Sequence, residues 1–99
     1  LLHDMGDELA DRTIAGKLPA KDLQVEFLAN SYEWRTPALW GIGLAQTVDS
    51  QATFLHDGRA RTLMEAVLWH GGEAKKQQQR VLKLDKQGRA ELNAFLQSL

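Results

Sequence analysis

The chain has 99 residues, of which 43% are hydrophobic and 25% are charged, and its formal net charge is -1. This composition is typical of one small folded domain, and the near-neutral charge offers little attraction for nucleic acid or an anionic membrane surface. No run of about 18 apolar residues is present, so we expect no membrane span. The absence of cysteine excludes disulfides, thiolate catalysis and cysteine-ligated zinc within this chain.

The N-terminal half shows weak signals for regular structure. Before residue 30, glycine and proline turn signals alternate with short apolar stretches, and only "AKDLQVEFLA", residues 20–29, favours a helix. In "RTPALWGIGL", residues 35–44, Thr36 followed by Pro37 is typical of an N-cap and a first helical residue. Because glycines follow, we expect that helix to last one or two turns. Residues 45–53 are expected to form a loop.

The segment after residue 60 carries a clear helix start. Thr62 and Glu65 have the spacing of a capping box, in which each side chain accepts a hydrogen bond from the backbone of the first turn. Apolar residues then recur at helical spacing. We therefore predict a helix over residues 63–70 that ends at the following glycine pair and turns Leu63 and Val67 inward.

Two further amphipathic surface helices are expected at residues 73–84 and 86–99. The run "KKQQQ" in the first of them is expected to form a solvated face. The apolar positions of the second helix are Leu92, Phe95, Leu96 and Leu99. The pattern as a whole predicts a mainly α fold with long loops.

Several chemical interpretations of the isolated histidines and tryptophans are weakly supported. The three histidines lie far apart, whereas zinc sites built from local ligands use separations of about two to five residues. A histidine next to an aspartate suits a hydrolase base, but no cysteine and no serine in a nucleophile elbow accompanies either pair. Tryptophans in so small a domain are more often core residues than a stacking platform. The residues concerned are His3, Asp4, Trp34, Trp40, His56, Asp57, Trp69 and His70.

Three segments resemble one protein family in the family's own order. They are "LLHDMG" at 1–6, "EWRTPALWGIGL" at 33–44 and "FLHDGRARTLMEAVLWHGGEA" at 54–74. Together they resemble the C-terminal haem domain of the bacterial di-haem cytochrome c peroxidase-like proteins, and most of all the di-haem oxidoreductase branch often labelled thiol oxidoreductase. The resemblance implies that residues 1–99 are the C-terminal part of a single, partial cytochrome c-like helical domain.

The resemblance also implies a metal ligand. In that family the helix after the "HDG" segment ends at the distal axial ligand of the C-terminal haem, and His70 is at this position. An imidazole there implies bis-histidine ligation, and a six-coordinate iron has no open position for peroxide, so the site would transfer electrons. The alternative is that His70 only donates to a carbonyl at the end of its helix.

The remaining cofactor contacts that the resemblance implies are arginine, histidine and tryptophan side chains. Arg35 and Arg59 are similar to residues that contact haem propionates or the haem edge, for which a guanidinium fork suits a carboxylate. Arg35 could equally be an ordinary surface ion pair. His56 is similar to a pocket histidine near a propionate, and Trp40 and Trp69 complete the expected contacts.

The family attaches haem c through a Cys-x-x-Cys-His segment that should precede "LLHDMG". We therefore expect a C-terminal fragment that alone holds no covalent haem and has no peroxidase activity. The expected partners are the upstream haem-bearing part of the protein and an electron-transfer partner, in the periplasm that the family implies. Apolar surface at Trp40, Leu44 and Trp69 should be buried against another copy. The alternative is a small helical protein-protein interaction module in which "WGIGL" and the tryptophans form a partner groove, with no redox role.

Overall fold

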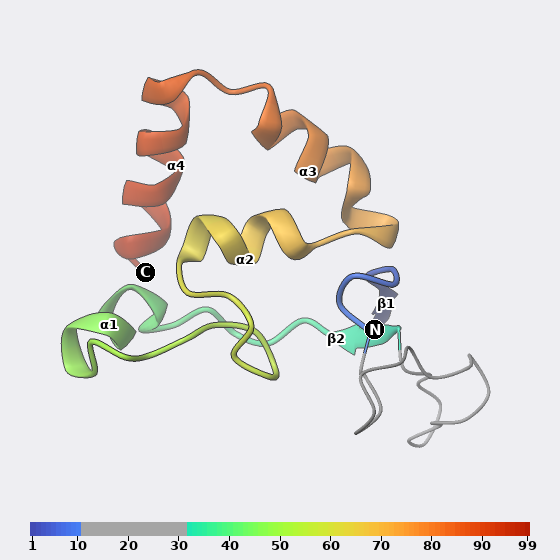
Figure 1. The fold of residues 1–99 in the computed structure, drawn as a ribbon, viewed down its shortest axis with the longest axis horizontal. Helices are drawn as coiled ribbons and strands as arrows, with labels where there is room; N and C mark the ends of the chain where they lie inside the picture. The colour runs from blue at the N-terminus through green and yellow to red at the C-terminus, as the bar shows by residue number, and fades with distance from the viewer. Residues whose placement is uncertain (11–31) are drawn as a thin grey trace.

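The computed structural model describes residues 1–10 and 32–99, and the helix expected at 20–29 lies outside these ranges. The described part is mainly helical, as predicted (Figure 1). Its α-helices are α1 (Ala45–Val48), α2 (Leu63–Trp69), α3 (Lys75–Leu82) and α4 (Lys86–Gln97). Its short 3-10 helices are η1 (Ile42–Leu44) and η2 (Gly72–Ala74), which directly precede α1 and α3.

A two-stranded antiparallel sheet joins the N-terminus to the middle of the chain. Strand β1 (Leu2–Asp4) pairs with β2 (Glu33–Arg35), with His3 opposite Trp34. Strands of three residues are too short to show an alternating pattern, so the sequence did not predict this sheet. The pairing places parts of the "LLHDMG" and "EWRTPALWGIGL" segments side by side.

Helix α2 begins and ends where the sequence predicts. The Thr62 hydroxyl accepts a hydrogen bond from the Glu65 amide at 3.0 Å. The Glu65 carboxylate accepts from the Arg61 amide at 3.0 Å, one residue before the position that a standard capping box uses. Leu63 is buried, Val67 is partly buried, and the chain leaves the helix at His70, whose backbone is extended.

The helix expected to begin at Thr36 is wrong. The loop expected over 45–53 is wrong for residues 45–48, which form α1, whereas residues 49–53 lie outside any helix or strand. Residues 36–39 have no regular structure, and helical structure begins only at η1 and continues into α1. Sheet pairing keeps the chain extended up to Arg35, and Pro37 disfavours a helical conformation for the residue before it. The turn into η1 is held by a contact with the C-terminal residue, because the Gly41 amide donates to the Leu99 carbonyl at 3.1 Å.

Helices α3 and α4 confirm the two predicted C-terminal helices, and α4 brings the C-terminus back beside α1 (Figure 1). Asp85 caps α4 by accepting from the Gly88 amide at 2.7 Å. The "KKQQQ" run is not fully solvated, because Gln78 is buried and its side-chain amide donates to the Leu68 carbonyl of α2. Gln78 therefore fastens α3 to the last turn of α2.

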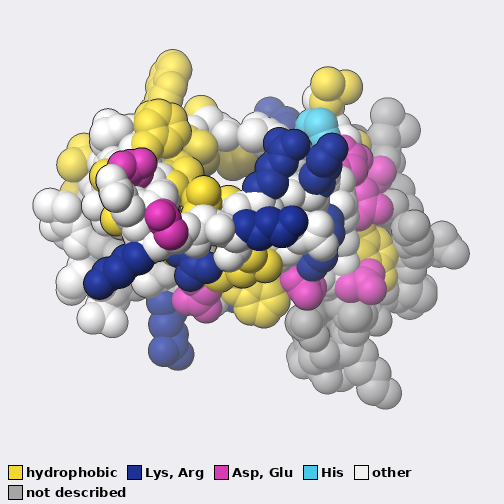
Figure 2. Space-filling view, turned by 90° about the horizontal axis from the view of Figure 1, so that it is seen from above, with side chains coloured by type: hydrophobic (Ala, Val, Ile, Leu, Met, Phe, Trp, Pro, Cys, Tyr) yellow, Lys and Arg dark blue, Asp and Glu magenta, His cyan; other side chains and the backbone are white. Residues whose placement is uncertain are grey.

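The buried apolar core of the described residues is small. Its main cluster contains Phe54, Ala60 and Leu63. Large apolar side chains remain at the surface, among them Trp40, which is 94% exposed, and Figure 2 shows apolar side chains beside a group of lysines and arginines. None of the helices in the described ranges has the length and apolar character needed to cross a membrane.

Replacing Thr62 with alanine tests the helix cap. Thr62→Ala removes the acceptor for the Glu65 amide and should lower the free energy of unfolding by about 1 kcal/mol, measured by urea titration followed by circular dichroism. The matched control is Thr36→Ala, because Thr36 is exposed and lies outside any helix. An equal loss for both variants would contradict the assignment of the cap.

Candidate functional site

The "HDG" segment forms a tight turn that closes on itself. The Phe54 amide donates to the Ala60 carbonyl at 2.8 Å, and the Ala60 amide donates back at 3.4 Å. Gly58 lies at a φ of 73°, in the left-handed region that glycine adopts without a steric penalty. The turn brings the side chains of Asp57 and Arg59 into contact.

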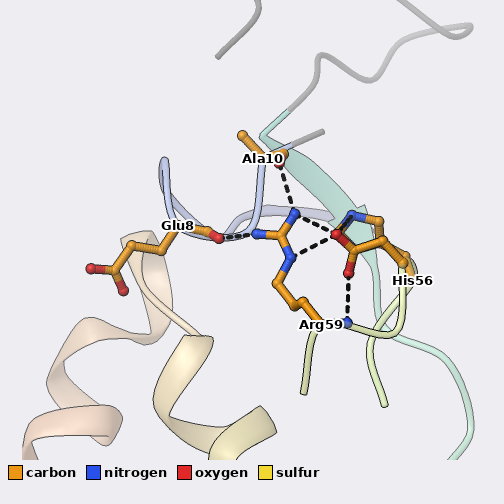
Figure 3. Close-up of polar contacts among 5 residues, drawn as sticks. Glu8, Ala10, His56 and Arg59 are labelled. Atoms are coloured by element: carbon orange, nitrogen blue, oxygen red, sulfur yellow. Dashed lines mark hydrogen bonds and ion pairs between the residues drawn. The ribbon is translucent and has the colours of Figure 1, made fainter. Parts of the chain in front are cut away.

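Arg59 is the centre of the site (Figure 3). Its Nε donates to Asp57 Oδ2 at 2.7 Å, and its Nη2 lies 2.7 Å from the same oxygen. Nη1 donates to the Glu8 carbonyl, and Nη2 donates to the Ala10 carbonyl at 3.3 Å. The guanidinium carbon lies 5.3 Å from the ring centroid of Trp69, so the side chain connects the turn, the N-terminal segment and α2.

The charge of Arg59 acts on the Asp57 carboxyl. The hydrogen bond from the Arg59 side chain lowers the pKa of Asp57 below its ordinary value of 3.8, with a further contribution from the Arg59 backbone amide and against a smaller opposing effect of burial. Asp57 is therefore ionised at neutral pH. The Asp57 side chain is 40% exposed, whereas that of Arg59 is 12% exposed, so the pair lies at the edge of the core.

His56 lies against an aromatic ring from the sheet. The imidazole stacks on Trp34 of β2, with ring centroids 3.9 Å apart and an interplanar angle of 22°. Its Nε2 is 3.9 Å from Asp57 Oδ2. The indole Nε1 of Trp34 is buried and has no hydrogen-bond partner among the described residues. His56 thus packs against Trp34 on the side of the turn that faces β2.

His70 is held at the C-terminus of α2 by its own helix. Its Nδ1 lies 2.8 Å from the Ala66 carbonyl oxygen, and because a carbonyl only accepts, Nδ1 carries the proton. Its backbone amide donates to the Val67 carbonyl at 3.3 Å. In the neutral form of the imidazole, Nε2 then carries the lone pair. Metal-binding histidines usually bind through one ring nitrogen while the other donates to a carbonyl or a carboxylate. The hydrogen bond of His70 has this form, so the residue is suited to bind iron through Nε2.

The glycine pair after His70 packs directly on the N-terminal segment. The Gly71 amide donates to the Met5 carbonyl at 3.1 Å. Gly72 lies at a φ of 50°, and a Cβ there would collide with the carbonyl oxygen of Asp4. The pair therefore has two roles, because it ends α2 and it permits a backbone contact that any side chain would block.

An exposed hydrogen bond between His3 and Glu73 adds to this contact. His3 Nδ1 lies 2.9 Å from Glu73 Oε2, and the Asp4 amide donates to Glu73 Oε1 at 3.2 Å. The hydrogen bond from His3 lowers the pKa of Glu73 the most, followed by that from the Asp4 amide. Beside this pair is an open depression of about 270 Å³, lined by His3, Met5, Thr36, Glu73, Ala74 and Gln77.

The structure brings together part of the residue set expected from the sequence. Arg59 contacts Trp69 directly, and His56 lies beside Asp57, the ion-pair partner of Arg59. Of the other expected contacts, Arg35 is exposed at the end of β2 and Trp40 is exposed before η1. Among the described residues no three His, Asp or Glu side chains are grouped as a metal site, so His3, His56 and His70 do not form one.

Two contributors to the site, Trp34 and Asp57, were not among the residues predicted to hold a cofactor. The signal for Asp57 was its spacing of two residues from Arg59 across a glycine turn, which permits a side-chain contact. No sequence signal identified the carbonyls of Glu8 and Ala10, because every residue has a carbonyl.

The Asp57–Arg59 pair makes stability depend on acidity. A depressed pKa in the folded state contributes stability that is present above the unfolded pKa and is lost as the pH falls through the folded value. Asp57→Asn should therefore lower the free energy of unfolding by up to about 1 kcal/mol at pH 7, a modest value because the pair is partly exposed. The difference from the unchanged chain should shrink below about pH 4.

Urea titrations between pH 3 and pH 7 measure this difference. Arg61→Gln is the control, since it removes an exposed arginine from the same region and should leave the pH dependence unchanged. A difference between Asp57→Asn and the unchanged chain that is constant across the range would show that the carboxylate is not stabilised in the fold.

Comparison with known proteins supplies the family. No match was found among curated proteins or among solved structures. The sequence model of one family, described as di-haem oxidoreductase, putative peroxidase, matches residues 1–99, the whole of the chain. The chain therefore belongs to the di-haem oxidoreductase family.

Proposed function

We propose that this chain supplies the distal axial ligand of a c-type haem, and that the ligand is Nε2 of His70. The observation that carries the proposal is the 2.8 Å hydrogen bond from Nδ1 to the Ala66 carbonyl. Such a bond fixes the tautomer and the ring orientation, and it increases the basicity of the other nitrogen. The same bond occurs in a histidine with a purely structural role, so the experiment below separates the two.

Contacts at both ends of α2 hold the helix in place and so orient the imidazole of His70. The Thr62 cap fixes the start of α2, and the amide of Gln78 holds the Leu68 carbonyl near its end. Gly71 then fastens the chain that leaves His70 to Met5. Because both ends of α2 are fixed, the ring of His70 is presented with little loss of conformational entropy on binding.

Haem, when bound, supplies a one-electron iron couple. If a second histidine held the other face of the haem, no open position would remain for peroxide, so we propose electron transfer for this part of the protein. The chain has no cysteine, so we propose that the thioether attachment comes from another, haem-bearing part of the protein. Attachment of haem c outside the cytoplasm supports a periplasmic location.

Two exposed side chains are suited to contacts with the cofactor. Arg35 makes no ion pair with any described residue, and its guanidinium fork matches a propionate carboxylate. Trp40 presents a large apolar ring, with Leu44 exposed nearby in the sequence. We propose that the haem-bearing part of the protein, or a second copy of the chain, covers this apolar surface.

Substitution of His70 tests the ligand. In the haem-loaded protein His70→Ala should open a coordination position and produce a high-spin component in absorption and electron paramagnetic resonance spectra. His70→Met keeps a ligand but replaces nitrogen with a thioether, so the haem should stay low-spin and its potential should rise within the roughly 0.8 V range that axial ligands set. Redox titration measures the second effect.

The matched control is His3→Ala, which removes an imidazole from β1 and should leave spin state and potential unchanged. Spectra and potentials of both His70 variants that match those of the unchanged protein would rule out His70 as the ligand. A helical interaction module without a redox role would then remain, in which exposed Trp40 and Leu44 contact a partner.

A further inference from the structure

We infer that Arg59 is a positioning residue for the axial ligand, acting through Trp69 and the N-terminal segment rather than by gripping a haem propionate. The inference rests on the proposed role of His70. It assigns Arg59 a function that differs from the cofactor contact implied by the family resemblance.

The first step is that the hydrogen-bonding capacity of Arg59 is almost fully used within the chain. A guanidinium has five N–H groups. Nε and Nη2 are directed at Asp57, Nη2 also donates to the Ala10 carbonyl, and Nη1 donates to the Glu8 carbonyl. At most one N–H, on Nη1, is left for another acceptor. Bidentate recognition of a propionate needs two parallel N–H groups, so it would require Arg59 to leave these partners.

The second step is the contact with α2. The guanidinium lies over the ring of Trp69, 5.3 Å from its centroid, and Trp69 is the last residue of the helix. A cation over an indole face is attracted to it, and the attraction strengthens with burial. Because Trp69 immediately precedes His70, whatever fixes the indole also limits rotation of the backbone that carries the imidazole.

The third step is that the N-terminal segment, residues 5–10, is linked to the chain both just before and just after His70. Arg59 holds the carbonyls of Glu8 and Ala10 and contacts Trp69 before the histidine. The Gly71 amide, after the histidine, donates to the Met5 carbonyl. Residues 5–10 are thus linked to the end of α2 by two sets of contacts. One is made by Arg59 and the other by the Gly71 amide.

The geometry of the guanidinium is essential to this role. Asp57 binds one edge of the fork while two backbone carbonyls bind the rest, and the flat face stays free for Trp69. A lysine ammonium keeps the charge but has no planar fork and cannot hold these partners in one plane. Arg59→Lys should therefore preserve the orientation of His70 only in part.

The experiment compares spin states in the haem-loaded protein. Arg59→Gln should raise the ratio of high-spin to low-spin haem roughly tenfold, the order of change expected when the charge-assisted hydrogen bonds that hold the N-terminal segment beside Trp69 are lost. Arg59→Lys and Asp57→Asn should give smaller increases, and they carry the test if Arg59→Gln does not fold. Arg61→Gln is the matched control, since it removes an exposed arginine two residues away and should leave the ratio unchanged.

The ratio of high-spin to low-spin haem is normalised to the amount of bound haem. A general loss of stability lowers the haem content and therefore does not by itself change this ratio. The inference is overturned if the Arg59 variants match Arg61→Gln while His70→Ala still alters the spectrum; the ligand proposal then stands alone. If His70→Ala has no effect, the ligand proposal fails, and the positioning role of Arg59 fails with it.

Discussion

The arrangement of this domain depends on the contacts of the guanidinium of Arg59, whose side chain is 12% exposed. The guanidinium joins a turn, the N-terminal segment and the last residue of α2, and its partner Asp57 compensates its charge. Because residues 1–10 and 32–99 bury few apolar side chains, these polar contacts contribute a larger share of the free energy that holds this part of the fold together. Removing Arg59 would leave the carbonyls of Glu8 and Ala10 without their donor.

The same attachments determine what the end of α2 can do. His70 leaves the helix with its Nδ1 proton directed to the Ala66 carbonyl, and the following Gly71 is fastened to Met5. A stiff backbone and one defined tautomer are what a metal-binding imidazole requires, because a ligand that must first be ordered binds more weakly. In a family of di-haem proteins this arrangement supports the proposed role of His70 as an iron ligand.

Local sequence patterns predicted the elements that depend on local contacts. Thr62 predicted the start of α2, and the glycines after His70 predicted its end, because caps and helix breakers act within one turn. The helix expected at Thr36 failed because sheet pairing, a long-range contact, fixes the chain up to Arg35. The backbone partners of Arg59 could not be predicted for a related reason. The Ala10 carbonyl lies 49 residues away in the sequence, and a backbone carbonyl is present in every residue.

The central claim is that Nε2 of His70 binds the iron. The most direct test is a crystal structure of the haem-loaded protein that contains this chain. The account predicts Nε2 of His70 bonded to iron, Nδ1 still directed to the Ala66 carbonyl, and Arg59 still bound to Asp57. An iron whose distal position is held by another side chain or by water, with the imidazole turned away, would contradict it.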